Sequence, residues 1–144
     1  MAEPRVLIVD DNALNIELAT FVLEEASFVV DSVMDAGELM AHIATFQPDL
    51  ILMDIQLPGS DGLTLTRRIK ADPGTRGIAI AAFTAYAMKG DEAKMRAVGC
   101  DGYIAKPIEV TTLVDQVRAI LQSVRGGQVG AAAFDKPPEN PAPG

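Results

Sequence analysis

The chain has 144 residues, which suits one domain and is enough to bury a hydrophobic core without disulfides. Its apolar share of 49% and charged share of 22% are typical of a globular protein and exclude a disordered chain. Twenty acidic residues against 12 basic residues give a net charge of −8, which argues against a nucleic-acid-binding function.

The single cysteine and the single histidine limit the possible chemistry further. One cysteine, Cys100, excludes an intramolecular disulfide and any zinc site with several thiolates. One histidine, His42, excludes multi-histidine metal sites, and a Ser-His-Asp triad would have to use it. We expect Cys100 to be a packing residue and His42 a solvated surface residue. No signal peptide is evident, and no apolar run approaches the ~20 residues of a membrane span, so a soluble cytoplasmic protein is expected.

Short apolar runs alternate with helical patterns along the chain. Strands are predicted at residues 6–9, 28–30, 50–53, 78–83 and 103–105. Helices are predicted at 12–26, 35–46, 63–71, 91–98 and about 110–124. In the first helix, Leu14, Leu18 and Phe21-Val22 recur at helical spacing, and Asp35 is a candidate cap for the second. Residues 58–62 are predicted to form a loop, because this segment is rich in proline, glycine and aspartate.

This alternation predicts an α/β fold, (βα)5, with a doubly wound five-stranded parallel sheet covered by helices on both faces. The predicted domain spans residues 1–125. Residues 126–144 are rich in glycine, alanine and proline, show no periodicity, and are expected to be a disordered tail.

Polar residues follow four of the predicted strands. They are Asp10 and Asp11 after the first strand, Asp54 after the third, Thr84 after the fourth and Lys106 after the fifth. Each alone could be a cap, a turn residue or a solvated cation, but the carboxyl ends of parallel strands meet at one rim of the sheet. Three carboxylates repel one another unless a cation compensates them, and Mg²⁺ with oxygen ligands fits such a site.

Several motifs resemble the receiver domain of bacterial two-component response regulators. They are Asp10-Asp11, the run from Asp49 to Pro58, Gly62, Thr84-Ala85 and the run from Tyr103 to Pro107, and the resemblance covers about residues 5–124. Within that family, the stretches 53–58 and 84–91 are most similar to stand-alone DivK-type regulators and to receivers of hybrid kinases. The resemblance implies a flavodoxin-like sheet with strand order 2-1-3-4-5.

The resemblance also implies a phosphoryl-transfer site. Asp54 matches the phosphoacceptor, and Lys106 matches the cation that pairs with a phosphoryl oxygen. Mg²⁺ (or Mn²⁺) is expected to be bound by Asp10, Asp11, Asp54 and the backbone carbonyl of Gln56.

Further residues match the switching parts of the family. Thr84 matches the switch hydroxyl and Tyr103 the switch aromatic, which together reshape the surface of the fourth helix, fifth strand and fifth helix. The Lys106–Pro107 peptide bond is expected to be cis. Gln56 and Tyr86 match the positions that, in this family, tune hydrolysis of the acyl phosphate.

The function that follows is a single-domain response regulator of a two-component or phosphorelay system. Its expected partners are a sensor histidine kinase or histidine phosphotransfer protein and a downstream effector protein, without nucleic acid or membrane. The expected state is a monomer or a weak phosphorylation-dependent dimer. The 19 residues after Arg125 are too few for an output domain. No enzymatic turnover is expected beyond formation and hydrolysis of its own acyl phosphate.

Three other functions compete with this interpretation. A pseudo-receiver would act only as an interaction module, but the set of site residues is complete. An aspartyl-phosphate phosphatase needs a second aspartate two residues after its nucleophile, where this chain has Gln56. A flavin-binding module needs a phosphate loop after the first strand, where Asp10 and Asp11 would repel phosphate.

Overall fold

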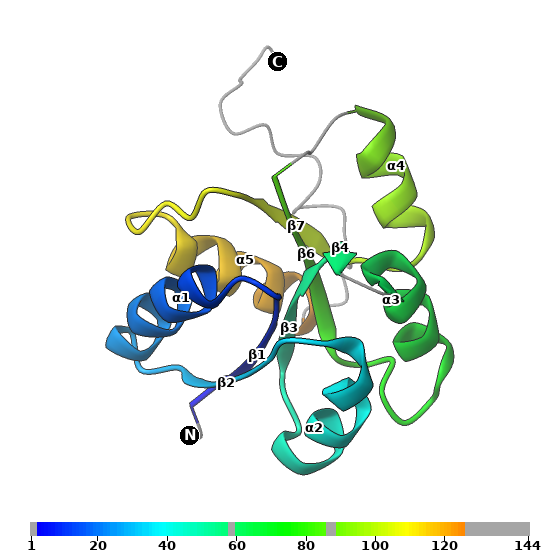
Figure 1. Cartoon of the computed structure of the whole chain (residues 1–144), viewed down its shortest axis with the longest axis horizontal. Coiled ribbons are helices and arrows are strands. Elements are labelled where there is room, and N and C mark those ends of the chain that lie inside the picture. Colours follow the sequence, from blue (N-terminus) through cyan, green and yellow to red (C-terminus); the bar gives the residue numbers. More distant parts are fainter. Residues whose placement is uncertain (1–2, 58–59, 86–88, 126–144) are drawn as a thin grey trace.

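The computed structural model describes residues 3–57, 60–85 and 89–125. Within these ranges, the main sheet contains five parallel strands in the order β2-β1-β3-β6-β7 (Figure 1). The strands are β1 (Arg5–Val9), β2 (Val29–Val33), β3 (Leu50–Asp54), β6 (Ala79–Thr84) and β7 (Gly102–Ala105). The predicted α/β fold and its 2-1-3-4-5 strand order are confirmed. The prediction of a disordered tail at 126–144 concerns residues outside the described part.

Helices cover both faces of the sheet (Figure 1). On one face lie α1 (Ala13–Glu25) and α5 (Leu113–Arg125), and on the other lie α2 (Leu39–Phe46), α3 (Gly62–Ala71) and α4 (Lys89–Ala97). A single 3-10 turn, η1 (Ala36–Glu38), precedes α2. Among the residues that the structure describes, no helix is long and apolar enough to cross a membrane.

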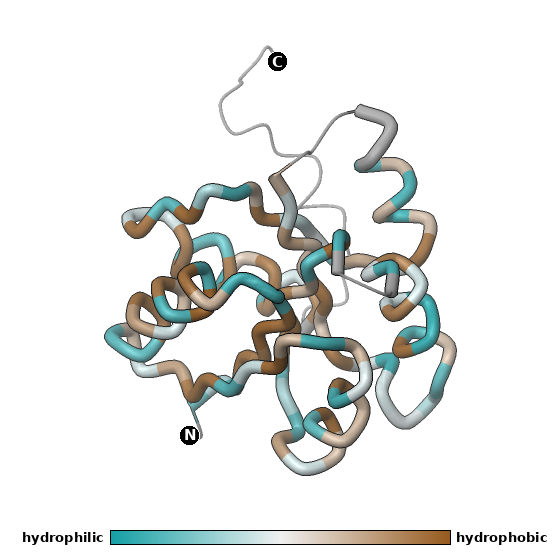
Figure 2. Tube along the Cα trace, in the orientation of Figure 1, coloured by the Kyte–Doolittle hydropathy of each residue, from teal (hydrophilic) through white to brown (hydrophobic). Residues whose placement is uncertain are grey.

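The strands alternate their side chains between two hydrophobic clusters. Val6 and Ile8 of β1 pack towards α1 and α5, whereas Leu7 and Val9 pack towards α2, α3 and α4. The central strands β1, β3 and β6 are therefore apolar along almost their whole length, which Figure 2 shows as brown tube through the middle of the molecule. This is the pattern of a parallel sheet buried on both faces.

Local capping explains where several helices begin and end. The Asp35 side chain accepts a hydrogen bond from the Gly37 backbone N–H at 2.9 Å and so caps η1, as predicted for the start of this helical segment. Asp61 caps α3 in the same way, through the Leu63 N–H. Gly99, just after α4, has φ 105°, a conformation that favours glycine.

The loop prediction for residues 58–62 and the short second strand need correction. Residues 58–59 lie outside the described part, whereas Ser60–Asp61 form strand β5, antiparallel to β4 (Gln56–Leu57), and Gly62 already belongs to α3. The second strand extends to Val33, because the polar residues Asp31 and Ser32 pair with β1 at the edge of the sheet. Edge strands tolerate polar side chains, so an apolar run underestimates their length.

The first helix forms as predicted, but it buries a different set of side chains. Leu14 and Phe21 are 72% and 63% exposed, and Leu18 is also exposed, whereas Ala19, Val22 and Leu23 are buried. The periodicity of Leu14, Leu18 and Phe21 therefore indicates the helix correctly and marks its solvent face. Because apolar residues occur on both sides of α1, their spacing alone does not select the buried side.

Cys100 and His42 lie outside the strand ends that carry the acidic residues. Cys100 is buried beside β7, and burial raises the pKa of its thiol to about 12. A thiol in this state is a packing group and a poor nucleophile. His42 of α2 is two-thirds buried, with its Nδ1 atom 2.9 Å from the Asp31 carboxylate of β2.

Candidate phosphoacceptor site

Strand register brings the predicted site residues together at the carboxyl ends of the parallel strands, which form one end of the sheet. Val9 of β1 pairs with Met53 of β3, and Asp54 pairs with Phe83 of β6. Thr84, which ends β6, pairs with Ala105 of β7. Asp10, Asp54, Thr84 and Lys106 thus stand at the carboxyl ends of four neighbouring parallel strands, where open α/β sheets bind their ligands.

Three carboxylates form the centre of this edge. Asp10, Asp11 and Asp54 each place one oxygen within 4.8 Å of the others. Asp10 is fully buried, Asp54 is 4% exposed and Asp11 is exposed. The group of three carboxylates is therefore accessible to solvent at Asp11, whereas Asp10 and Asp54 are buried.

A single ammonium group lies against two of these carboxylates. The Lys106 Nζ atom is 3.1 Å from Asp10 Oδ2 and 3.5 Å from Asp54 Oδ2. It also lies 4.9 Å from the centre of the buried Phe83 ring, whose face attracts a cation. The Lys106 N–H donates to the Thr84 carbonyl, and the Lys106–Pro107 peptide bond is cis.

Backbone hydrogen bonds orient the two buried carboxylates. Asp10 Oδ1 accepts from the Asn12 N–H at 2.9 Å, and Asp54 Oδ1 accepts from the Gln56 N–H at 2.9 Å. The Asn12 side chain caps α1 through the Asn15 N–H. Neither Asp10 nor Asp11 is therefore needed as the cap of this helix, which was the main structural alternative for that pair.

The donor set fits a hard divalent cation. Carboxylate oxygens are the ligands that Mg²⁺ and Mn²⁺ take in proteins, and Mg²⁺ needs only one or two carboxylates beside water and phosphate oxygens. The three oxygens of Asp10, Asp11 and Asp54 lie close enough together to share one ion. The exposed Asp11 leaves this group accessible from solvent.

Burial changes the acidity of Asp54. Desolvation is the largest influence and raises the pKa of this carboxyl, with the nearby Asp10 charge acting in the same direction. The Gln56 hydrogen bond and the Lys106 charge lower it without cancelling the effect of burial. Folding therefore makes the ionised form of Asp54 less favourable than it is in the unfolded chain.

The Asp54→Asn variant is accordingly expected to be more stable than the natural chain at pH 7 in the presence of a chelator. A carboxyl whose pKa is raised by folding contributes stability in acid, and this contribution is lost as the pH rises through the raised pKa. Asparagine carries no charge, so we expect a Tm higher by a few degrees at pH 7 and a smaller difference towards pH 4. Thermal unfolding followed by circular dichroism measures both values. A lower Tm for the variant at pH 7 would contradict this account.

Gly62 allows the start of α3 to lie close to the chain at the end of β3. Its N–H donates to the Ile55 carbonyl at 3.3 Å, so the start of α3 lies directly against the chain that follows β3. A Cβ atom on Gly62 would overlap the Asp54 carbonyl oxygen and lie 2.6 Å from Ile55 Cα. The absence of a side chain here permits this close approach.

The other predicted site residues, namely the switch residues and those expected to tune hydrolysis, lie in several different elements. Thr84 is buried at the end of β6, and Tyr103 of β7 is half-buried against the cluster that contains Met95. Gln56 is exposed in β4. Tyr86 and its predicted role in hydrolysis lie outside the described residues. Sequence reasoning missed the Phe83 ring and Asn12, since neither belongs to a charge pattern.

The fold and this site define a two-component signalling domain, and the chain belongs to the response regulator receiver domain family, which residues 6–118 match. It is similar to the polar-differentiation response regulator DivK of Brucella anthropi, with 40% identity over 116 residues. These residues are 81% of this chain and 94% of that protein. The curated DivK of Brucella ovis matches to the same extent.

Solved structures give the same result. A CheY-like response regulator receiver domain protein from Methanospirillum hungatei has a TM-score of 0.78 and 27% identity, over 87% of this chain and 98% of that one. The receiver domain of a signal transduction histidine kinase from Syntrophus aciditrophicus has a TM-score of 0.75 and 29% identity. That match covers 85% of this chain and 92% of the other. The resemblance deduced from the sequence motifs is confirmed.

Proposed function

We propose that Asp54 accepts a phosphoryl group from a phosphohistidine of a partner protein. The observation that carries this proposal is the meeting of the Asp10, Asp11 and Asp54 carboxylates with the Lys106 ammonium at one edge of the sheet. A carboxylate is a competent nucleophile for phosphorus, and the transfer needs little beyond positioning and charge stabilisation.

The proposed phosphoryl transfer forms one bond to phosphorus and breaks another. An Asp54 oxygen forms a bond to phosphorus, the phosphorus–nitrogen bond of the donor breaks, and the imidazole leaves with the electron pair and takes up a proton. Lys106 pairs with a phosphoryl oxygen, since its Nζ already lies 3.5 Å from Asp54. Asp10, Asp11, Asp54 and the Gln56 carbonyl would bind Mg²⁺ (or Mn²⁺), which neutralises charge on the transferring oxygens when bound.

The phosphorylated state ends by hydrolysis. Water attacks phosphorus, the bond between phosphorus and Asp54 breaks, and the carboxylate and inorganic phosphate are released. On this proposal the chain turns over no separate substrate and acts as a timed signal. The Asp54-Ile55-Gln56 sequence, without a second carboxylate beside Asp54, supports it over a phosphatase.

Recognition of a protein donor is supported by the exposed face of α1. Leu14, Leu18 and Phe21 form an apolar stripe on a helix that begins two residues after Asp11. Exposed apolar side chains in a row are typical of protein contact surfaces. A sensor histidine kinase or histidine phosphotransfer protein is therefore the donor that we propose.

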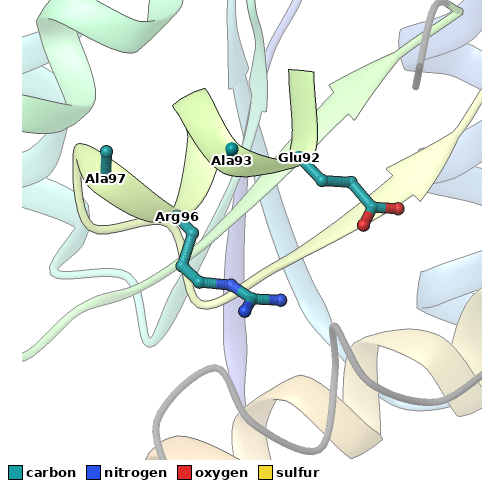
Figure 3. A pocket seen from close by; sticks show the side chains of 4 residues that line it. All are labelled: Glu92, Ala93, Arg96 and Ala97. Carbon is teal, nitrogen blue, oxygen red and sulfur yellow. The ribbon is translucent and has the colours of Figure 1, made fainter. Parts of the chain in front are cut away.

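The phosphorylated chain would pass the signal to its effector through the surface formed by α4, β7 and α5, with Thr84 and Tyr103 as the switch residues. On α4, the side chains of Glu92, Ala93, Arg96 and Ala97 line a hollow of about 440 Å³ (Figure 3). Figure 3 shows Glu92 and Arg96 extending beyond the two small alanines. The matched polar-differentiation response regulators DivK, 94% covered by this chain, support a stand-alone regulator.

Intact-mass spectrometry after incubation with acetyl phosphate tests the proposal. We expect one phosphoryl adduct that requires Mg²⁺ and is absent in the Asp54→Asn variant. Asp49→Asn is the matched control, because Asp49 directly precedes the same strand at its other end. It should form the adduct normally.

An adduct that persists in Asp54→Asn would refute the assignment of Asp54. If no adduct forms in any variant, beryllofluoride with Mg²⁺ is the second probe, because it occupies the site without a donor. Failure to bind beryllofluoride would favour the pseudo-receiver interpretation.

A further inference from the structure

A second concave site lies at the opposite end of the molecule from the acidic group. It is a groove of about 370 Å³ beside Pro4, at the amino end of β1, whereas Asp10 follows the carboxyl end of that strand. The groove lies between the N-terminal segment, the turn after α1 and the last turns of α5, which packs beside α1 (Figure 1). Its volume is in the range of ordinary ligand and peptide pockets.

The chemistry of the groove is apolar with two opposite charges. Pro4, Ala26, Phe28 and Leu121 provide the apolar lining, and Glu3 and Arg118 provide the charges. The Arg118 guanidinium lies 5.7 Å from the Phe28 ring centre. Among the described residues, no carboxylate forms an ion pair with Arg118. The groove therefore suits an aromatic or aliphatic side chain next to a carboxylate.

The chain itself carries a segment of that chemistry close by. Leu121 and Gln122 of α5 line the groove, and this helix ends at Arg125, one turn beyond Leu121. A further 19 residues follow Arg125 in the sequence. Phe134 is the only aromatic residue among them, and Asp135 and Lys136 follow it directly. An aromatic ring, an acid and a base in this order complement the apolar lining and the two charges of the groove.

The connection has a suitable length and composition. Residues 126–133 include Gly126, Gly127 and Gly130, so this stretch permits a reversal of direction after α5. A glycine-rich linker of this length spans roughly 16 Å on average. The tether keeps the segment at an effective concentration of order millimolar near the groove. Weak contacts of one ring and one ion pair are then sufficient for docking within the same chain.

We infer that this groove is the docking site of the chain's own residues 134–136. The Phe134 ring packs against the apolar lining, the Asp135 carboxylate pairs with Arg118, and the Lys136 ammonium faces Glu3. This contact ties α5 to the N-terminal segment and to the turn after α1. It is independent of the proposed phosphorylation, because it lies at the other end of the sheet.

Paramagnetic relaxation in the full chain tests the inference. A nitroxide is attached to a cysteine introduced by Glu139→Cys, and the buried Cys100 is protected from the reagent. We expect loss of amide signal intensity at residues 26–28 and 118–122. The loss should disappear with Phe134→Ala and persist with Val129→Ala, the matched control for an apolar tail residue.

Exchanging the charges of Asp135 and Arg118 provides a second test. Asp135→Arg should abolish the intensity loss, and adding Arg118→Asp should restore it. Signal loss spread evenly over the surface, or centred on Leu14, Leu18 and Phe21, would refute docking in the groove. A mixed sample contains isotope-labelled chains without nitroxide and unlabelled chains that carry the nitroxide. Loss of amide signal in this sample would show that the tail of one copy docks on another copy, and this would also refute the inference.

Discussion

Replacing Gly62 with alanine is expected to damage the acidic site, although it adds only one methyl group. The added Cβ would overlap the Asp54 carbonyl oxygen and lie 2.6 Å from Ile55 Cα, and both neighbours are backbone atoms that cannot rotate away. The end of β3 or the start of α3 must move. A displacement of about 1 Å at a reacting group costs roughly 100-fold in rate. We therefore expect about 100-fold slower phosphorylation by acetyl phosphate.

The same variant should lose stability by about 1–3 kcal/mol, the usual cost of overpacking. Gly77→Ala is a matched control, because a Cβ at Gly77 meets no atom within 4 Å. Its effect should stay within about 0.5 kcal/mol. Initial rates of adduct formation and urea unfolding curves measure the two quantities. Equal behaviour of the two alanine variants would show that the close approach of α3 to Asp54 is unimportant.

Replacing Lys70 with methionine is expected to destabilise the chain strongly without touching the acidic site. The Lys70 ammonium lies 2.8 Å from Asp101 Oδ2, and Asp101 is fully buried. Lys70 also donates to the Ile78 carbonyl at 2.8 Å. The Ile80 N–H donates to the same Asp101 Oδ2 at 2.9 Å, whereas Oδ1 has no hydrogen-bond partner among the described residues. Removal of the cation therefore leaves a buried carboxylate with one neutral hydrogen bond.

Breaking such a pair costs about 3–5 kcal/mol. For a domain of this size the Tm should fall by roughly 10–20 °C. Lys94→Met removes an exposed lysine of α4 and should change the Tm little. Adding Asp101→Asn to Lys70→Met should recover part of the loss, because the buried charge is then gone. Calorimetry measures the Tm of the natural chain, Lys70→Met, Lys94→Met and the double variant. A double variant no more stable than Lys70→Met would argue against the charge explanation.

Much of the fold and of the acidic site could be predicted because strand ends and charge patterns are local in the sequence. The apolar runs at 50–53 and 78–83 indicate buried parallel strands, and the carboxyl-end rule then places Asp54 and Thr84 at one edge. Lys106 follows from the same rule. These inferences need only the order of the elements and the right-handed connection between them.

Other features depend on contacts between distant residues and could not be deduced. Which face of α1 is buried depends on α5 and the sheet, since both sides of α1 are apolar. The ring of Phe83 beneath Lys106 follows from the register of β6 with β7. The Lys70–Asp101 pair joins residues far apart in sequence, and neither belongs to a recognisable motif.

The strand order also has a consequence for the synthesis of the chain. β1 is made first, yet it lies between β2 and β3, so it gains its second neighbour only after residue 54 has left the ribosome. Lys106 follows β7, the last strand of the sheet to be made. Asp10 and Asp54 can therefore meet before the cation that contacts both of them has been translated. Their mutual repulsion opposes early closure of this edge, which favours completion of the sheet after most of the chain has emerged.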